Sequence, residues 1–184
     1  INGTQASTAV LALAVSGAVR LARAADVVAA MTIDALRGSI GPFDPRIHAE
    51  RPLEGQNRSA ANIAALLAGS PILESHADCS RVQDAYSMRC AAQVHGSARE
   101  GIAFARRVVE VEANAATDNP MVFARDGDIV SGGNFHGAPV ALAGDVLAIA
   151  LSQLATISER RTERLVNPAL SGLPAFLTQR GGLE

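Results

Sequence analysis

The feature that most constrains the fold is a set of long segments in which almost nothing interrupts an α-helix. From Thr4 to Leu36 the only helix-disfavouring residue is Gly17, and one internal glycine costs only about 1 kcal/mol relative to alanine. At 1.5 Å per residue, such a helix would be about 50 Å long. Because residues 9–19 are apolar on nearly every side, we expect this helix to be buried all round.

Two further segments have the apolar spacing of long helices. Within residues 86–115 the apolar residues that recur every three or four positions are Ala91, Val94, Ala98, Ile102, Ala105 and Val109. Within residues 139–166 the stricter set is Val140, Ala143, Leu147, Ala150, Leu154 and Ile157. Alternating steps of three and four are typical of helices packed at a shallow crossing angle. We therefore predict helices near 4–36, 86–115 and 139–166, with a shorter one near 59–67.

The remaining segments contain turn residues. Glycine and proline predict a loop over 38–45, and residues 70–82 are expected to be irregular. Short apolar runs on either side of Asp126-Gly127 predict a small hairpin over 121–130. The fold class is therefore all-α, an elongated bundle of long helices with one small β-hairpin.

The helix lengths bear on domain organisation. A compact domain of this size would have a radius of gyration near ~16 Å, too small to contain rods of roughly 40–50 Å. We expect residues 1–184 to be the central helical-bundle part of a single larger domain, completed by other chains. The chain begins at Ile1 without a methionine, and both ends resemble cuts through a longer protein.

Composition argues against several classes of protein. The net charge is −2 and aromatic residues make up 3%, so a nucleic-acid partner is not expected. The longest apolar run, residues 9–19, is too short to cross a bilayer, so no membrane partner is expected either. The two cysteines are too few for a disulfide framework and indicate a cytoplasmic protein with reduced thiols. The histidines lack metal-ligand spacing, which favours structural roles and no metal: His48, His76, His95 and His136.

The strongest chemical signal is the triplet Gln83, Tyr86 and Arg89. Their spacing of three predicts one shared face at the start of the second long helix. Arginine can hold a substrate carboxylate with two hydrogen bonds, and tyrosine can donate a hydrogen bond or move a proton. The alternative is an ordinary solvated helix start.

Two other segments carry weaker signals. Three glycines within Ser131–Gly137 would let the backbone approach another group closely, but no phosphate-binding pattern surrounds them. The charged run Glu159–Arg161, continued by Glu163 and Arg164, predicts a salt-bridged exposed face or a subunit contact.

Six motifs follow one another along the chain: Ile1–Gln5, Gln83–Cys90, Thr117–Pro120, Ser131–Gly137, Ser158–Arg161 and Leu173–Leu177. Their order and spacing resemble those of the aromatic amino-acid ammonia-lyases over essentially the whole chain, with the histidine ammonia-lyases as the nearest branch. The resemblance implies an all-helical homotetramer with active sites shared between subunits. It also implies a carbon–nitrogen lyase that eliminates ammonia from an aromatic amino acid, converting L-histidine to urocanate.

The resemblance also implies roles for single residues. Asn2 would lie beside an electrophile, Tyr86 would be the active-site tyrosine, and Arg89 would hold the substrate carboxylate. Gln83 would lie in the same pocket, and Phe135 would place its ring near the electrophile. That electrophile, 4-methylideneimidazole-5-one, forms in the family from Ala-Ser-Gly, a tripeptide this sequence lacks.

The resemblance places Ala-Ser-Gly upstream of residue 1, so these 184 residues alone are expected to be inactive. Two alternatives stay open. One is a phenylalanine or tyrosine ammonia-lyase or an aminomutase, which would use the same electrophile. The other is a non-catalytic helical assembly module.

Overall fold

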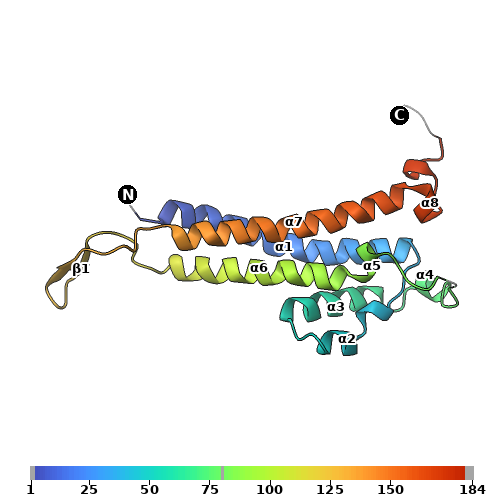
Figure 1. Cartoon of the computed structure of the whole chain (residues 1–184), viewed down its shortest axis with the longest axis horizontal. Helices are drawn as coiled ribbons and strands as arrows, with labels where there is room; N and C mark the ends of the chain where they lie inside the picture. Colours follow the sequence, from blue (N-terminus) through green and yellow to red (C-terminus); the bar gives the residue numbers. More distant parts are fainter. Residues whose placement is uncertain (1–2, 80, 181–184) are drawn as a thin grey trace. The chain divides into compact units, whose positions relative to one another are not determined.

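A computed structural model describes residues 3–79 and 81–180 of the chain (Figure 1). Its long helices are α1 (Gln5–Ala35), α6 (Ala91–Glu112) and α7 (Ala138–Val166). The shorter elements are η1 (Gly41–Phe43), α2 (Pro45–Ala49), α3 (Glu54–Leu67), α4 (Pro71–Glu74), α5 (Tyr86–Arg89), β1 (Met121–Phe123), β2 (Asp128–Val130), α8 (Pro168–Ser171) and η2 (Ala175–Leu177). The all-α prediction with one hairpin is confirmed.

The continuous helix predicted over 86–115 is wrong at its start. Cys90 has φ −100° and ψ 13°, outside the helical region, so α5 ends there and α6 begins at residue 91. Residues 70–82 are also not wholly irregular, because the Ser70 hydroxyl accepts a hydrogen bond from the Leu73 amide and caps α4. Helix α3 starts at Glu54, ahead of the expected residue 59.

The chain divides into two compact units. Unit 1 comprises residues 1–20 and 100–151, and unit 2 comprises residues 21–99 and 152–184. Each long helix therefore contributes one part to each unit. The prediction that residues 1–184 are one part of a larger domain stays a prediction.

Unit 1 packs three helix segments and carries the hairpin. Thr4, which directly precedes α1, connects the start of that helix to the end of α6, since its hydroxyl donates to Glu112 Oε2 at 2.8 Å. Gly101 provides close packing, because a Cβ there would lie 2.8 Å from the Cβ of Ala150. In the hairpin, Met121 pairs with Val130 across an antiparallel ladder, and Gly127 takes a positive φ of 75° in the turn.

The expectation that the first helix is buried all round is wrong for the single chain. In α1, Leu11, Val15 and Ala18 are buried, whereas Val10 and Leu13 are 70% and 76% exposed. The buried residues recur every three or four positions, so only one stripe of the helix packs within unit 1. The opposite apolar stripe has no cover from the described part of this chain.

Unit 2 holds a hydrophobic cluster that joins α1, η1, α3, α5 and α6. Its central members are Ala29, Ile33, Phe43, Ile63, Met88 and Ala92. Helices α3 and α6 pack so closely that a Cβ at Gly96 would overlap the backbone of Gln56. Helix α2 packs beside α3 (Figure 1). There the buried His48 ring donates from Nε2 to the Pro42 carbonyl at 3.1 Å and accepts at Nδ1 from the Gln56 side-chain amide at 3.0 Å. Since Met88 belongs to α5, this cluster holds α5 against the other helices of unit 2.

Two of the described helices, α1 and α7, have the length and apolar composition of a membrane span. The apolar run 9–19, which is too short to cross a bilayer, forms only part of α1. Buried helices of bundle proteins pass the same test, so this observation does not by itself indicate a membrane segment.

Candidate active site

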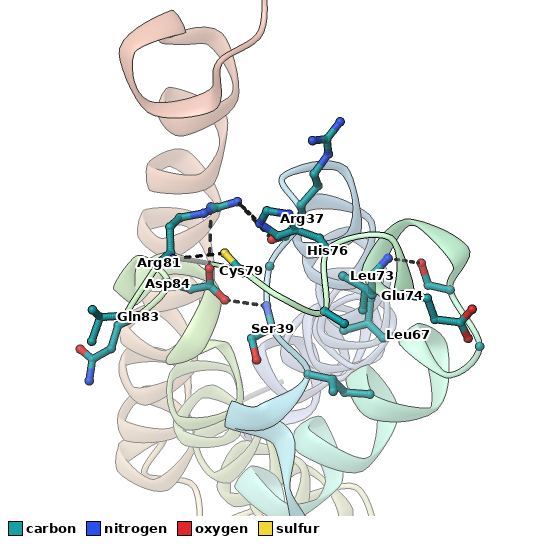
Figure 2. A pocket seen from close by; sticks show the side chains of 16 residues that line it. Arg37, Ser39, Leu67, Leu73, Glu74, His76, Cys79, Arg81, Gln83 and Asp84 are labelled. Carbon is teal, nitrogen blue, oxygen red and sulfur yellow. Dashed lines mark hydrogen bonds and ion pairs between the residues drawn. The ribbon is translucent and has the colours of Figure 1, made fainter.

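The segment before α5 is held to the loop after α1 by a carboxylate and a guanidinium. Asp84 Oδ2 accepts a hydrogen bond from the Ser39 amide at 2.6 Å. Arg81 Nη2 donates to the carbonyls of Leu36 and Arg37, each at 3.2 Å, and contacts His76 (Figure 2). These contacts hold Arg81 and Asp84 in place. They therefore fix Gln83, which lies between the two in sequence.

A cavity of about 390 Å³ in unit 2 is the best candidate for a substrate site. Gln83, Arg89 and Gln93 line it, together with Ser39, Pro42 and Ile47. Arg89 Nε and Gln93 Oε1 are buried there without a hydrogen-bond partner among the described residues. An unpaired guanidinium N–H beside a cavity suits a carboxylate, which accepts strong charge-assisted hydrogen bonds.

Tyr86 stands at the first position of α5, one turn from Arg89. The Arg89 guanidinium carbon lies 4.5 Å from the centre of the Tyr86 ring, within the range of a cation–π contact. Tyr86 is 72% exposed, so its phenol is open to a ligand or to another chain.

The structure therefore brings Gln83 and Arg89 to one cavity and places Tyr86 against Arg89, although Tyr86 itself does not line that cavity. One correction concerns Gln83. Gln83 precedes α5 and does not lie on its face, because α5 begins only at Tyr86. Gln83 also borders a larger cavity of about 510 Å³, shown in Figure 2, whose lining includes Arg37, His76 and Cys79.

Two further site residues were predicted, Asn2 and Phe135. Asn2 falls outside the described residues. Phe135 is 42% exposed in the glycine-rich loop, which belongs to unit 1, whereas the residues that line the cavity belong to unit 2. The Gly132 amide donates to Asn119 Oδ1 at 2.8 Å, and nothing lies within 4 Å of a Cβ built at Gly132, Gly133 or Gly137. Within the described chain, this loop therefore encloses no other group.

A buried polar network lies next to α5. Asp26, His95 and Arg161 are 1%, 0% and 2% exposed. The expectation that Glu159–Arg161 forms an exposed face or a subunit contact is wrong for Arg161, although Arg160 is exposed and pairs with Glu159. Arg161 Nη1 donates to the Ser87 carbonyl at 3.1 Å, which links the network to the helix of Tyr86 and Arg89.

Burial and pairing set the charges of this network. Burial by itself raises the pKa of Asp26, but hydrogen bonds from His95 and Asn62 and the charge of Arg99 together lower that pKa below its usual value. Burial lowers the pKa of Arg161 to about 10, and the negative charge of Asp26 partly opposes this effect. At neutral pH, Asp26 is thus an anion and Arg161 a cation.

Comparison with known proteins gives the family. A model of the family described as "Aromatic amino acid lyase" matches residues 1–184. The chain belongs to the aromatic amino acid lyase family. It is 58% identical over 184 residues to histidine ammonia-lyase of Myxococcus xanthus, covering all of this chain and 36% of that protein. The chain thus spans about a third of the length of the curated relatives it matches.

Solved structures agree with this lyase assignment. The crystal structure of histidine ammonia-lyase from Trypanosoma cruzi matches with a TM-score of 0.88 and 49% identity, over 99% of this chain and 33% of that one. Tyrosine aminomutase from Streptomyces globisporus matches with a TM-score of 0.90 and 38% identity, over 99% of this chain and 38% of that one.

The buried network of Asp26, His95 and Arg161 was not predicted from the sequence, although a signal was present. The apolar seam of α7 steps from Leu154 to Ile157, and a further step of four reaches Arg161. His95 follows Ala91 by four on α6, and Asp26 follows Ala22 by four on α1. A charged or titratable residue in register with an apolar seam indicates burial.

Among the described residues, no group of three or more histidine, cysteine or acidic side chains could hold a metal ion.

Proposed function

We propose that this lyase chain supplies part of the active site of a histidine ammonia-lyase, which eliminates ammonia from L-histidine to give urocanate. The sequence support is the 58% identity to a histidine ammonia-lyase across the whole chain. The observation that carries the proposal is Arg89, which lines a cavity together with Gln83 and whose buried Nε has no hydrogen-bond partner among the described residues.

Each residue has a role that its chemistry allows. Arg89 binds the substrate carboxylate, because its planar fork matches two carboxylate oxygens. Tyr86 donates a hydrogen bond or moves a proton at the reacting end, since its phenol is exposed beside the guanidinium. Gln83 and the unpaired Gln93 Oε1 provide neutral polar contacts for the amino group.

The residues of this chain suit a site that contains 4-methylideneimidazole-5-one, which would come from an Ala-Ser-Gly outside this sequence. The chain supplies a carboxylate-binding arginine and an open phenol, which are groups needed around a bound amino acid. When present, the electrophile makes the loss of a weakly acidic β-hydrogen and of the amine possible. Asn2 and Phe135 would lie beside it.

We further propose a cytoplasmic homotetramer with shared active sites. The exposed apolar stripe of α1, with Val10 and Leu13, offers a surface for other subunits. Sharing between subunits would let Phe135 of one chain reach a site formed by Gln83, Tyr86 and Arg89 of another.

The test is an assay of the full-length protein with L-histidine, following urocanate by its ultraviolet absorbance. We expect turnover in the wild type and a loss of about 100-fold or more in kcat with Tyr86→Phe, since proton transfer contributes roughly 10²–10⁴-fold. An unchanged Tyr86→Phe enzyme would contradict the role of the phenol.

A second candidate is an ammonia-lyase or aminomutase that acts on phenylalanine or tyrosine. The match to tyrosine aminomutase at a TM-score of 0.90 favours it. Gln83, Tyr86 and Arg89 would contact groups common to all α-amino acids, so they fit either substrate. Assays with L-tyrosine and L-phenylalanine separate the candidates by product: an unsaturated acid indicates a lyase and a β-amino acid indicates an aminomutase. No turnover of any of these substrates would favour the non-catalytic assembly module.

A further inference from the structure

The buried polar network ends on the backbone of α5, the helix that carries Tyr86 and Arg89. Its members come from three helices: Asp26 from α1, His95 from α6 and Arg161 from α7. All of them belong to unit 2, as does α5. None of the three lines either of the two cavities described above, so the proposed chemistry does not account for them.

The hydrogen bonds of His95 define its protonation. Its Nδ1 lies 2.8 Å from Asp26 Oδ1, and its Nε2 lies 3.3 Å from Arg161 Nη2. A guanidinium can only donate, so Nε2 must accept and the proton is on Nδ1, donated to the carboxylate. His95 is thus a neutral connector between an anion and a cation.

The Asp26 end is firmly held. Asp26 Oδ2 accepts from Arg99 Nη2 at 2.5 Å and from Asn62 Nδ2 at 2.8 Å. Arg99 in turn donates to the Ser59 hydroxyl at 2.9 Å and to the Ala22 carbonyl at 3.0 Å. The carboxylate is therefore fixed by helices on several sides, and through His95 it fixes Arg161.

The Arg161 end of the network contacts α5. Arg161 Nη1 donates to the carbonyl of Ser87, between Tyr86 and Arg89 in sequence. Helix α5 has only four residues, and its backbone leaves the helical path at Cys90. So short a helix has little stability of its own, and its position depends on contacts from outside.

We propose that Asp26, His95 and Arg161 are positioning residues, which hold α5 through the Ser87 carbonyl and thereby place Arg89 and Tyr86 for the substrate. This proposal rests on the proposed function, since it assigns a substrate contact to Arg89. Arg161 itself does not touch the substrate.

A double-mutant cycle in the full-length enzyme tests it. Arg161→Met is expected to lower kcat/KM for L-histidine by about 10- to 100-fold, because a small displacement of a binding group has effects of that order. In the Arg89→Lys enzyme, Arg161→Met is expected to lower kcat/KM by a factor at least about fivefold smaller, since the arginine that Arg161 positions is already absent. Arg161→Lys, which keeps the charge and one donor, is expected to recover part of the loss. Arg160→Met on the same helix is the matched control, with activity expected to be unchanged.

Amide hydrogen exchange supplies a readout that does not depend on turnover. In Arg161→Met, the peptide covering residues 86–90 is expected to exchange at least about fivefold faster, while hairpin peptides exchange at the wild-type rate. If Arg161→Met does not assemble, Arg161→Lys takes its place in both experiments.

The results separate the two proposals. A wild-type enzyme that makes no urocanate refutes the proposed function, whereas the exchange of residues 86–90 still tests the positioning. If Arg161→Met costs the same factor with Arg89 and with Lys at position 89, Arg161 acts only through general stability. If exchange over residues 86–90 is unchanged, Arg161 does not hold α5. Either result would overturn the inference.

Discussion

Arg89 combines two contacts that constrain its guanidinium. Its guanidinium carbon lies 4.5 Å from the Tyr86 ring centre, and its buried Nε has no hydrogen-bond partner among the described residues. Leaving such a donor unpaired is costly in a folded protein, and a bound carboxylate removes that cost. This geometry supports the proposal that Arg89 binds a carboxylate.

Arg89→Lys in the full-length enzyme keeps the charge but loses the two-pronged donor. We expect about 2–4 kcal/mol less transition-state binding, which is roughly a 30- to 1000-fold fall in kcat/KM for L-histidine. Steady-state kinetics measures this, with Arg58→Lys on the exposed side of α3 as the control. Unchanged kinetics for Arg89→Lys would show that the residue is structural.

Asp26 makes stability depend on pH. Its pKa is lowered in the folded protein, so the stabilisation it provides is present above the unfolded-state pKa near 3.8 and is lost as pH falls through the lower folded-state value. Asp26→Asn is expected to destabilise the protein by about 3 kcal/mol at pH 7, because it leaves buried cations unpaired. Thermal unfolding should show a difference from wild type that shrinks below about pH 4. A difference that persists unchanged in acid would contradict the assignment.

Residue spacing alone could predict some of these residues and not others. Gln83, Tyr86 and Arg89 were predictable because they are close in sequence and chemically distinctive. Asp26, His95 and Arg161 come from three distant helices, and only the packing of those helices brings them together. A charged run such as Glu159–Arg161 gives no indication of which arginine is buried unless the apolar seam is extended through it.

At the scale of helices, α3 and α6 pack closely together in unit 2, the unit that holds the candidate site. A Cβ at Gly96 would overlap backbone atoms of Gln56, and backbone cannot move aside as a flexible side chain can. Gly96→Ala is expected to destabilise the protein by about 1–3 kcal/mol through overpacking.

Gly144→Ala is the matched control for that change. Gly144 is also in a long helix, α7, but nothing lies within 4 Å of a Cβ built there. It is expected to leave stability unchanged or to raise it by up to about 1 kcal/mol through helix propensity. Thermal unfolding of both variants measures the contrast, and equal effects would contradict the close-packing argument.

The long helices could be predicted because their seams are regular. All members of the α7 seam from Val140 to Ile157 are buried as predicted. The break at Cys90 could not be predicted, since no glycine or proline marks it; the backbone turns there while Met88 packs into the hydrophobic cluster. Short elements such as α4 depend on single capping contacts, which spacing does not reveal.

At the scale of the whole molecule, the exposed apolar surface predicts association. Val10, Leu13, Met31 and Ile149 are each more than 60% exposed, at 70%, 76%, 66% and 64%. Patches of this kind mark interfaces between proteins. In the full-length protein, Leu13→Glu is expected to shift the assembly to smaller species by light scattering after size exclusion. Arg58→Lys should leave the assembly unchanged, and a monomeric wild type would contradict the homotetramer.

The 184-residue chain by itself lacks Ala-Ser-Gly and so should release no urocanate from L-histidine. Purified chain that turns histidine over would refute the role given to the electrophile. Addition of the chain to assays of the full-length enzyme provides a control for inhibition by the preparation.

The central claim is that Arg89 binds the carboxylate of L-histidine in a cavity it shares with Gln83. The most direct measurement is the kcat/KM for urocanate formation by full-length wild type and Arg89→Lys, assayed in parallel with the Arg58→Lys control. We expect clear turnover in the wild type and the control, and a loss of about 30- to 1000-fold in Arg89→Lys, because lysine cannot form the paired hydrogen bonds to the carboxylate. Equal rates for Arg89→Lys and wild type would contradict it.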